Sequence, residues 1–155
     1  MEHITTLPVY CVDDDITILK LIEHRLGLEG LKIQGTFQSG EECINSLTNK
    51  PGIILLDFKL MGLNGLDTLK QIKKKLPKLK VIILTSLEDS SLKKKCIDAG
   101  AYNFINKNIA QDETMFKSIL ENIKKISTER KPLVIYYLIG AIIILSIILY
   151  FMMMG

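Results

Sequence analysis

The sequence predicts an α/β protein with a five-stranded, parallel, doubly wound sheet, followed by a single C-terminal transmembrane helix. Short apolar runs alternate with segments in which apolar residues recur at helical spacing, and residues 133–154 carry no charged side chain. Strands and helices that alternate at these lengths fold into three layers with right-handed crossovers. The expected strand order is 2-1-3-4-5.

Four apolar runs are the strand candidates, at residues 9–12, 53–56, 81–84 and 102–105. Apolar runs of this length are expected when helices cover both faces of a strand. The alternation with five helices predicts five strands in total.

Five helices are expected around these strands. The first begins near Ile16 with Asp15 as its N-cap, and the second opens on the capping-box sequence SGEE at residues 39–42 and runs through Leu47. The fourth covers residues 92–99. The first, third and fifth helices show apolar residues three or four apart: Leu19, Ile22 and Leu26; Leu66, Leu69, Ile72 and Leu76; Phe116, Ile119, Ile123 and Ile126.

The chain is expected to divide into an N-terminal tail at residues 1–6, an α/β domain at 7–128, a basic juxtamembrane linker at 127–132 and a transmembrane helix at 133–154. A bilayer core about 30 Å thick needs about 20 residues of helix. The Leu, Ile, Val and Phe side chains of the last segment favour insertion by roughly 4 to 8 kcal/mol in total. The alternative is a very apolar core helix or oligomer interface, but a sheet covered on both faces leaves no cavity for one.

Basic residues predict the orientation of this helix. Lys124, Lys125, Arg130 and Lys131 precede it, and no basic residue follows. The positive-inside rule therefore places the α/β domain in the cytoplasm, on a single-pass, tail-anchored protein of the cytoplasmic membrane.

Reactive side chains stand at the ends of four strands: Asp13 and Asp14, Asp57, Thr85 and Lys107. Ligands of an open parallel sheet bind beyond the carboxyl ends of its strands, so these groups are expected to form one site. Clustered carboxylates repel one another unless a cation neutralises them, and hard oxygen ligands suit Mg²⁺. A hydroxyl and an ammonium suit phosphoryl oxygens, and a carboxylate can be the nucleophile in phosphoryl transfer.

In order and spacing, these residues resemble the receiver domain of two-component response regulators over roughly residues 5–128. The resemblance also implies a flavodoxin-like fold. The segments that carry it are VDDD at 12–15, LLD at 55–57 followed by Gly65, LTS at 84–86, and AGA at 99–101 followed by Phe104 and Lys107.

The resemblance implies Mg²⁺ as the cofactor and a role for each acidic residue. Asp14 and Asp57 would bind the metal directly, together with the backbone carbonyl of Lys59. Asp13 would act through a water molecule.

The resemblance also implies that Asp57 accepts the phosphoryl group while Thr85 and Lys107 hold its oxygens. Thr85 and Phe104 would then form the switch. Two positions depart from the family's pattern, because Met61 and Asn108 stand where the family usually has proline. The second affects the family's typically cis bond after the lysine, which costs about 2.5–4 kcal/mol without proline.

The expected function is that of a membrane-anchored, stand-alone receiver, not an enzyme, that takes a phosphoryl group on Asp57 in two-component phosphorelay signalling. Its partners would be a histidine kinase or phosphotransfer protein, an unidentified downstream protein and the lipid bilayer. A homodimer through the fourth helix, fifth strand and fifth helix is a further expectation.

Two alternatives stay open: a membrane adaptor that binds proteins without being phosphorylated, and a less favoured phosphohydrolase. Nucleic-acid binding is not expected. The formal net charge is +3, and the lysine runs at 73–75 and 93–95 are typical of solvated helix faces.

Overall fold

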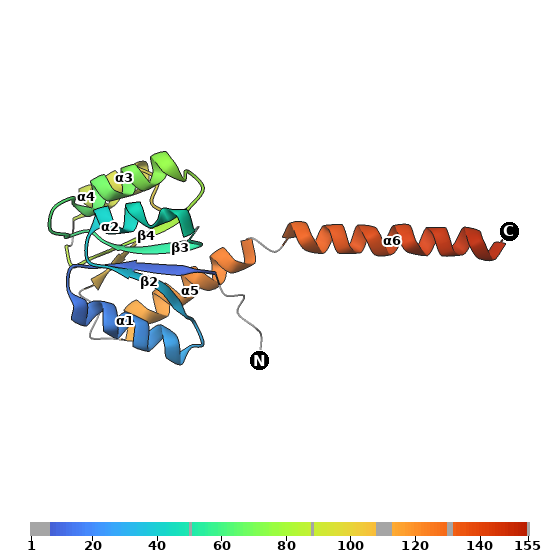
Figure 1. Ribbon diagram of the computed structural model, residues 1–155, viewed down its shortest axis with the longest axis horizontal. Helices are drawn as coiled ribbons and strands as arrows, with labels where there is room; N and C mark the ends of the chain where they lie inside the picture. Colours follow the sequence, from blue (N-terminus) through green and yellow to red (C-terminus); the bar gives the residue numbers. More distant parts are fainter. Residues whose placement is uncertain (1–6, 50, 88, 108–112, 130–131, 155) are drawn as a thin grey trace.

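A computed structural model describes residues 7–49, 51–87, 89–107, 113–129 and 132–154 (Figure 1). In chain order, the elements are β1 Val9–Val12, α1 Ile16–Leu28, β2 Ile33–Phe37, α2 Gly40–Asn45, the 3-10 turn η1 Leu47–Asn49, β3 Ile53–Asp57, α3 Gly65–Lys75, β4 Lys80–Thr85, α4 Ser90–Asp98, β5 Asn103–Asn106, α5 Glu113–Glu129 and α6 Pro132–Met154.

The five strands form one parallel sheet in the order β2-β1-β3-β4-β5, which confirms the predicted five-stranded, doubly wound α/β sheet and its strand order. The strand register decides which groups meet at the carboxyl edge. Asp57 pairs with Leu84, and Thr85, the last residue of β4, pairs with Asn106. The ends of β3, β4 and β5 therefore lie side by side.

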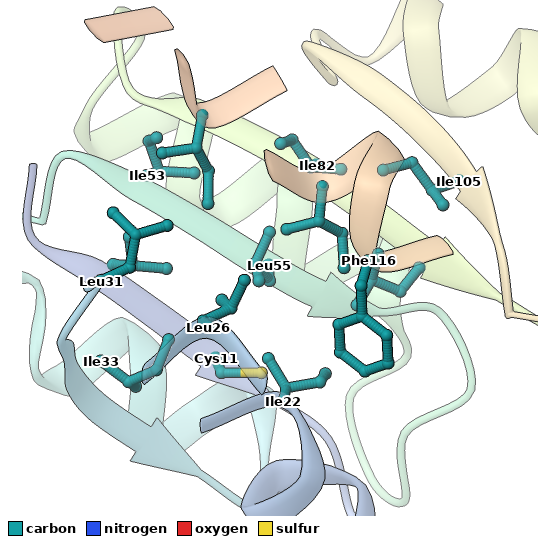
Figure 2. Close-up of a cluster of buried hydrophobic side chains, with 14 of the residues drawn as sticks. Cys11, Ile22, Leu26, Leu31, Ile33, Ile53, Leu55, Ile82, Ile105 and Phe116 are labelled. Atoms are coloured by element: carbon teal, nitrogen blue, oxygen red, sulfur yellow. The ribbon is translucent and has the colours of Figure 1, made fainter. Parts of the chain in front are cut away.

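Helices cover both faces of the sheet, with α1 and α5 on one side and α2, α3 and α4 on the other (Figure 1). Successive strand residues point to opposite faces, so Cys11 and Leu55 belong to the first core and Val12 and Leu56 to the second. Figure 2 shows the first core, where strand side chains such as Leu55 meet Phe116 of α5. This continuous burial of β3 explains its unbroken apolar run.

Local hydrogen bonds explain where two helices begin. Asp15 caps α1 as predicted, because its carboxylate accepts the N–H of Thr17 at 2.8 Å. At α2, Ser39 Oγ accepts the N–H of Glu42 at 3.2 Å, which is half of the predicted capping box. The other half is displaced by one residue, since the Glu42 carboxylate accepts the N–H of Gln38 at 3.1 Å.

The element bounds differ from the predicted ones in a few places. The sequence patterns did not locate β2, which has the mixed sequence IQGTF and alternating burial. Helix α2 ends at Asn45, and Leu47 belongs to η1. Helix α4 begins at Ser90 because Asp89 caps it by accepting two backbone N–H groups. Strand β5 lies one residue later than expected.

Helix α6 extends away from the three layers (Figure 1). Its described side chains are mostly apolar and largely exposed, as at Ile142, Leu145 and Phe151. Within the described part of the chain, no helix combines the length and apolar character needed to cross a membrane. The transmembrane helix is therefore not supported by the described structure and stays a prediction. The predicted tail at residues 1–6 lies outside the described residues.

Candidate functional site

Three carboxylates meet at the carboxyl ends of β1 and β3, as the sequence predicted. Asp13, Asp14 and Asp57 each place one carboxylate oxygen within 4.8 Å of the others. Asp13 and Asp57 are 2% and 3% exposed, and Asp14 is half-buried. Negative charges this close together in a mostly buried place repel one another, which favours a cation beside them.

Lys107 supplies positive charge to this cluster. Its Nζ donates to Asp57 Oδ1 at 2.8 Å and to Asp13 Oδ2 at 2.5 Å. Burial alone would lower the pKa of Lys107, but the hydrogen bonds and charges of the two carboxylates outweigh it and raise the pKa. The lysine is therefore cationic at neutral pH and joins the ends of β1, β3 and β5.

Backbone N–H groups orient the same carboxylates. Asp57 Oδ2 accepts the N–H of Lys59 at 2.9 Å, and Asp13 Oδ1 accepts the N–H of Asp15 at 3.0 Å. Burial raises the pKa of Asp57, the charge of Asp13 adds to this rise, and Lys107 and the Lys59 N–H partly offset it. The ionised Asp57 carboxylate is consequently under-compensated, which favours the arrival of a further cation.

Thr85 is fully buried at the end of β4, between the strands that end in Asp57 and precede Lys107. Its Oγ1 accepts the N–H of Leu87 at 3.2 Å. This contact uses an oxygen lone pair and not the hydroxyl proton, so the hydroxyl retains a proton with which to donate.

The segment after β3 folds back onto Asp57 because position 65 is glycine. A Cβ at Gly65 would stand 2.5 Å from Phe58 Cα and 2.6 Å from the carbonyl oxygen of Asp57. The N–H of Gly65 instead donates to the carbonyl of Phe58 at 2.9 Å. Gly65 thus gives the loop its close approach to the site.

Phe104, the predicted switch aromatic, is half-buried in β5 and packs against the core under α2, α3 and α4. It pairs with Ile83 of β4, two residues before Thr85. Asn108 and the bond that joins it to Lys107 lie outside the described residues.

The donor set fits Mg²⁺. Oxygen ligands at about 2.0–2.1 Å in an octahedron stand about 2.9–4.2 Å apart, so small side-chain rotations would let Asp14 and Asp57 bind the ion directly, with Asp13 close enough to act through a water molecule. Asp14, half-buried and at the rim, leaves room for the water molecules that Mg²⁺ usually retains. The carbonyl of Lys59 stays a predicted ligand, since the described contact of Lys59 with Asp57 is made by its N–H.

Residues 9–119 match the response regulator receiver domain family. The chain belongs to this family. Receiver domains bind Mg²⁺ at an acidic pocket, and Asp13, Asp14 and Asp57 form such a cluster in this receiver. Receiver domains also interact with histidine kinases or phosphotransfer proteins.

Among curated proteins, the receiver is 37% identical over 107 residues to the DNA-binding transcriptional regulator NtrC of Klebsiella pneumoniae, a match that covers 68% of this chain and 23% of NtrC. It is 33% identical over 105 residues to the transcriptional activator ExaE of Pseudomonas putida, covering 66% and 49% of the two chains. This chain therefore spans half or less of the length of these relatives.

Solved structures show the same fold. The response regulator domain of Thermotoga maritima CheB superposes with a TM-score of 0.71 at 25% identity, covering 79% of this chain and 97% of that one. A chain of the CheX-CheY-BeF3-Mg²⁺ complex from Borrelia burgdorferi superposes with a TM-score of 0.65 at 27% identity, and the match covers 74% of this chain and 89% of that one.

The structure brings Asp13, Asp57 and Lys107 into direct contact and places Asp14 beside them. Two residues that bond to the segment between β3 and α3, Glu41 and Thr68, were missed by sequence reasoning. Glu41 was interpreted only as part of a capping box. The signal for Glu41 was the pair of adjacent glutamates at the start of α2, because one glutamate suffices for a cap.

Proposed function

We propose that this receiver accepts a phosphoryl group on Asp57 from a histidine kinase or phosphotransfer protein, with Mg²⁺ as cofactor. One observation carries the proposal: Asp57, 3% exposed, lies 2.8 Å from the Lys107 ammonium within a cluster of three carboxylates. A cation and carboxylates around one buried aspartate suit a charged phosphoryl group better than they suit a neutral substrate.

In the proposed step, an Asp57 carboxylate oxygen attacks the phosphorus of a phosphohistidine on the donor. The new O–P bond forms as the P–N bond breaks, and the departing imidazole nitrogen keeps the electron pair and takes up a proton from water. Bound Mg²⁺ would supply positive charge to the phosphoryl oxygens during this transfer. The products are an aspartyl phosphate and an unmodified histidine.

Lys107 and Thr85 are the groups that would hold the product. Lys107 Nζ already touches Asp57, so it lies within reach of an oxygen on a phosphoryl group attached there. The Thr85 hydroxyl would donate its proton to a second oxygen, which draws the end of β4 toward Asp57. We propose that this movement, together with Phe104, changes the surface formed by α4, β5 and α5, where a downstream protein or a second copy would bind.

The chemistry is that of a signalling phosphoacceptor and not of an enzyme that acts on free substrates. Incubation with acetyl phosphate and Mg²⁺, followed by intact mass measurement, tests whether Asp57 accepts a phosphoryl group. The wild type should gain one phosphoryl group, and Asp57→Asn should gain none. Equal labelling of the two proteins would refute the assignment, while an unlabelled wild type would favour the phosphorylation-independent adaptor.

We also propose that residues 133–154 anchor the receiver to the cytoplasmic membrane, with the receiver in the cytoplasm. The support is the uncharged apolar sequence and the exposure of its helix, with Ile142 64% and Phe151 70% exposed. An apolar helix exposed on every side needs an apolar environment.

A further inference from the structure

The loop between β3 and α3 follows Asp57 directly, and α2 holds its outer half. Glu41, in the first turn of α2, accepts the backbone N–H of Leu63 through Oε1 at 3.1 Å, although 22 residues separate the two. The neighbouring Gly62 has φ of +77°, and a Cβ there would stand 3.2 Å from the same Glu41 oxygen. The loop therefore approaches this carboxylate closely.

A second contact holds the end of the loop where it enters α3. Thr68 of α3 is fully buried, and its hydroxyl donates to the carbonyl of Asn64 at 2.9 Å, with the Leu63 carbonyl at 3.3 Å. Gly40 of α2 packs directly on this hydroxyl, because a Cβ at Gly40 would stand 2.1 Å from Thr68 Oγ1. The start of α2 therefore meets the loop at Leu63 and the first turn of α3 at Thr68.

The inner half of the loop determines the surroundings of Asp57. Phe58 donates its N–H to Leu84 and accepts the N–H of Gly65, and the Lys59 N–H donates to Asp57 Oδ2 at 2.9 Å. These hydrogen bonds of Phe58 and Lys59 hold the inner half of the loop. Met61, which is 79% exposed, lies in the outer half. The Glu41 contact at Leu63 restrains that outer turn.

We propose that Glu41 is a positioning residue for the Asp57 site, which it serves by holding the β3–α3 loop through the Leu63 N–H. The carboxylate fixes the path of the loop over residues 59–63, and so the place of the Lys59 backbone beside Asp57. Loss of the contact lets the loop sample conformations in which the Lys59 backbone no longer faces the carboxylate. This inference rests on the proposed phosphoacceptor function.

The test compares three variants of the full chain with the wild type. Glu41→Ala removes the acceptor of the Leu63 N–H, and Glu41→Gln retains an oxygen acceptor without the charge. Glu42→Ala is the matched control, because it removes the neighbouring carboxylate and its bond to the Gln38 N–H but leaves the loop contact intact. The measurements are Mg²⁺ affinity by titration, phosphorylation rate with acetyl phosphate, and the melting temperature.

Glu41→Ala should weaken Mg²⁺ binding and slow phosphorylation by about three- to tenfold, the loss expected for one hydrogen bond. Glu41→Gln should recover most of the Mg²⁺ affinity and of the phosphorylation rate. Glu42→Ala should have an affinity and a rate close to those of the wild type, although its melting temperature is similar to that of Glu41→Ala. Equal Mg²⁺ affinity and rate in Glu41→Ala and wild type would overturn the role of Glu41. Equal losses in the Glu41→Ala and Glu42→Ala variants would also overturn it, because they would reflect the stability of α2. A wild type that binds Mg²⁺ but takes no label would instead refute the phosphoacceptor function.

Discussion

Lys107 Nζ and Asp57 Oδ1 form an ion pair at 2.8 Å across the end of β4, which lies between their strands. The lysine side chain therefore passes over the carboxyl edge of the sheet, where Thr85 ends β4. This contact links the carboxyl ends of β3 and β5. The proposed phosphoryl group would attach to Asp57, beside the Lys107 ammonium.

The buried charge of Asp57 predicts an effect on stability. Burial raises the pKa of Asp57 above its ordinary value, so the ionised carboxylate disfavours the folded state at pH values above the raised pKa. This penalty shrinks as pH falls through the raised pKa and is gone below the ordinary one. Without metal at pH 7 to 8, Asp57→Asn should therefore melt at or above the wild-type temperature. Added Mg²⁺ should stabilise the wild type more, by about 2.7 kcal/mol at a concentration 100 times its Kd. Thermal melts with Mg²⁺ and with EDTA measure both effects, and a large metal-free loss in the variant would contradict them.

The acidic residues should contribute unequally to metal binding. Asp14→Ala removes a direct ligand, whereas Asp13→Ala removes a residue expected to act through water, and such outer contacts typically change affinity by about 10- to 100-fold. We expect the larger loss of Mg²⁺ affinity in Asp14→Ala. Because Asp13 also binds Lys107 and the Asp15 N–H, Asp13→Ala should lose more stability. Calorimetric titration and thermal melts of both variants separate the two effects, and a reversed order of affinity would contradict the assigned roles.

Gly65 should be sensitive even to alanine. The added Cβ would meet Phe58 Cα at 2.5 Å, so the loop must shift, at a cost of about 1 to 3 kcal/mol. Labelling of Asp57 should fall because the shift moves the backbone next to it. Gly27→Ala is the control, since it lies in α1 with nothing within 4 Å of its Cβ and should stabilise by about 0.5 to 1 kcal/mol. Similar melting temperatures for Gly65→Ala and Gly27→Ala would show that the close approach at Gly65 does not limit stability.

The Thr85 hydroxyl should couple phosphorylation to the distant surface. Thr85→Ala should still accept a phosphoryl group on Asp57, but the amide exchange of α4 and β5 should change less on phosphorylation than in the wild type. Thr85→Ser keeps the hydroxyl and should restore the response. Hydrogen exchange followed by mass spectrometry measures this difference. An unaltered response in Thr85→Ala would show that the signal bypasses the hydroxyl.

The apolar tail should decide where the protein resides but not its chemistry. Deletion of residues 133–155 should leave labelling by acetyl phosphate unchanged and release the receiver from membranes. Transfer from a membrane-bound kinase should slow, because tethering raises the effective concentration of the two partners. Membrane fractionation with alkaline carbonate tests the anchor itself. Extraction of the full-length protein by carbonate would refute a membrane-spanning tail.

Most of the sheet was predictable because its signals are local. The apolar runs that became β1, β3 and β4 lie in strands buried on both faces, where nearly every side chain must be apolar. Strand β2 lies at the edge of the sheet, and its alternating burial and central Gly35 leave a weaker pattern. The length of α2 was also overestimated, because Leu47 is buried from a 3-10 turn and not from the helix.

The sequence by itself determined the fold class, the strand order and which groups gather at the carboxyl edge, because strand periodicity and chain order place Asp13, Asp57, Thr85 and Lys107 there. Only the tertiary structure decided how these groups are connected. Loop paths and side-chain rotamers depend on contacts between distant segments, and local sequence carries little record of them. The Lys107 ion pairs, the Lys59 N–H at Asp57 and the hold of Glu41 on Leu63 all arise in this way.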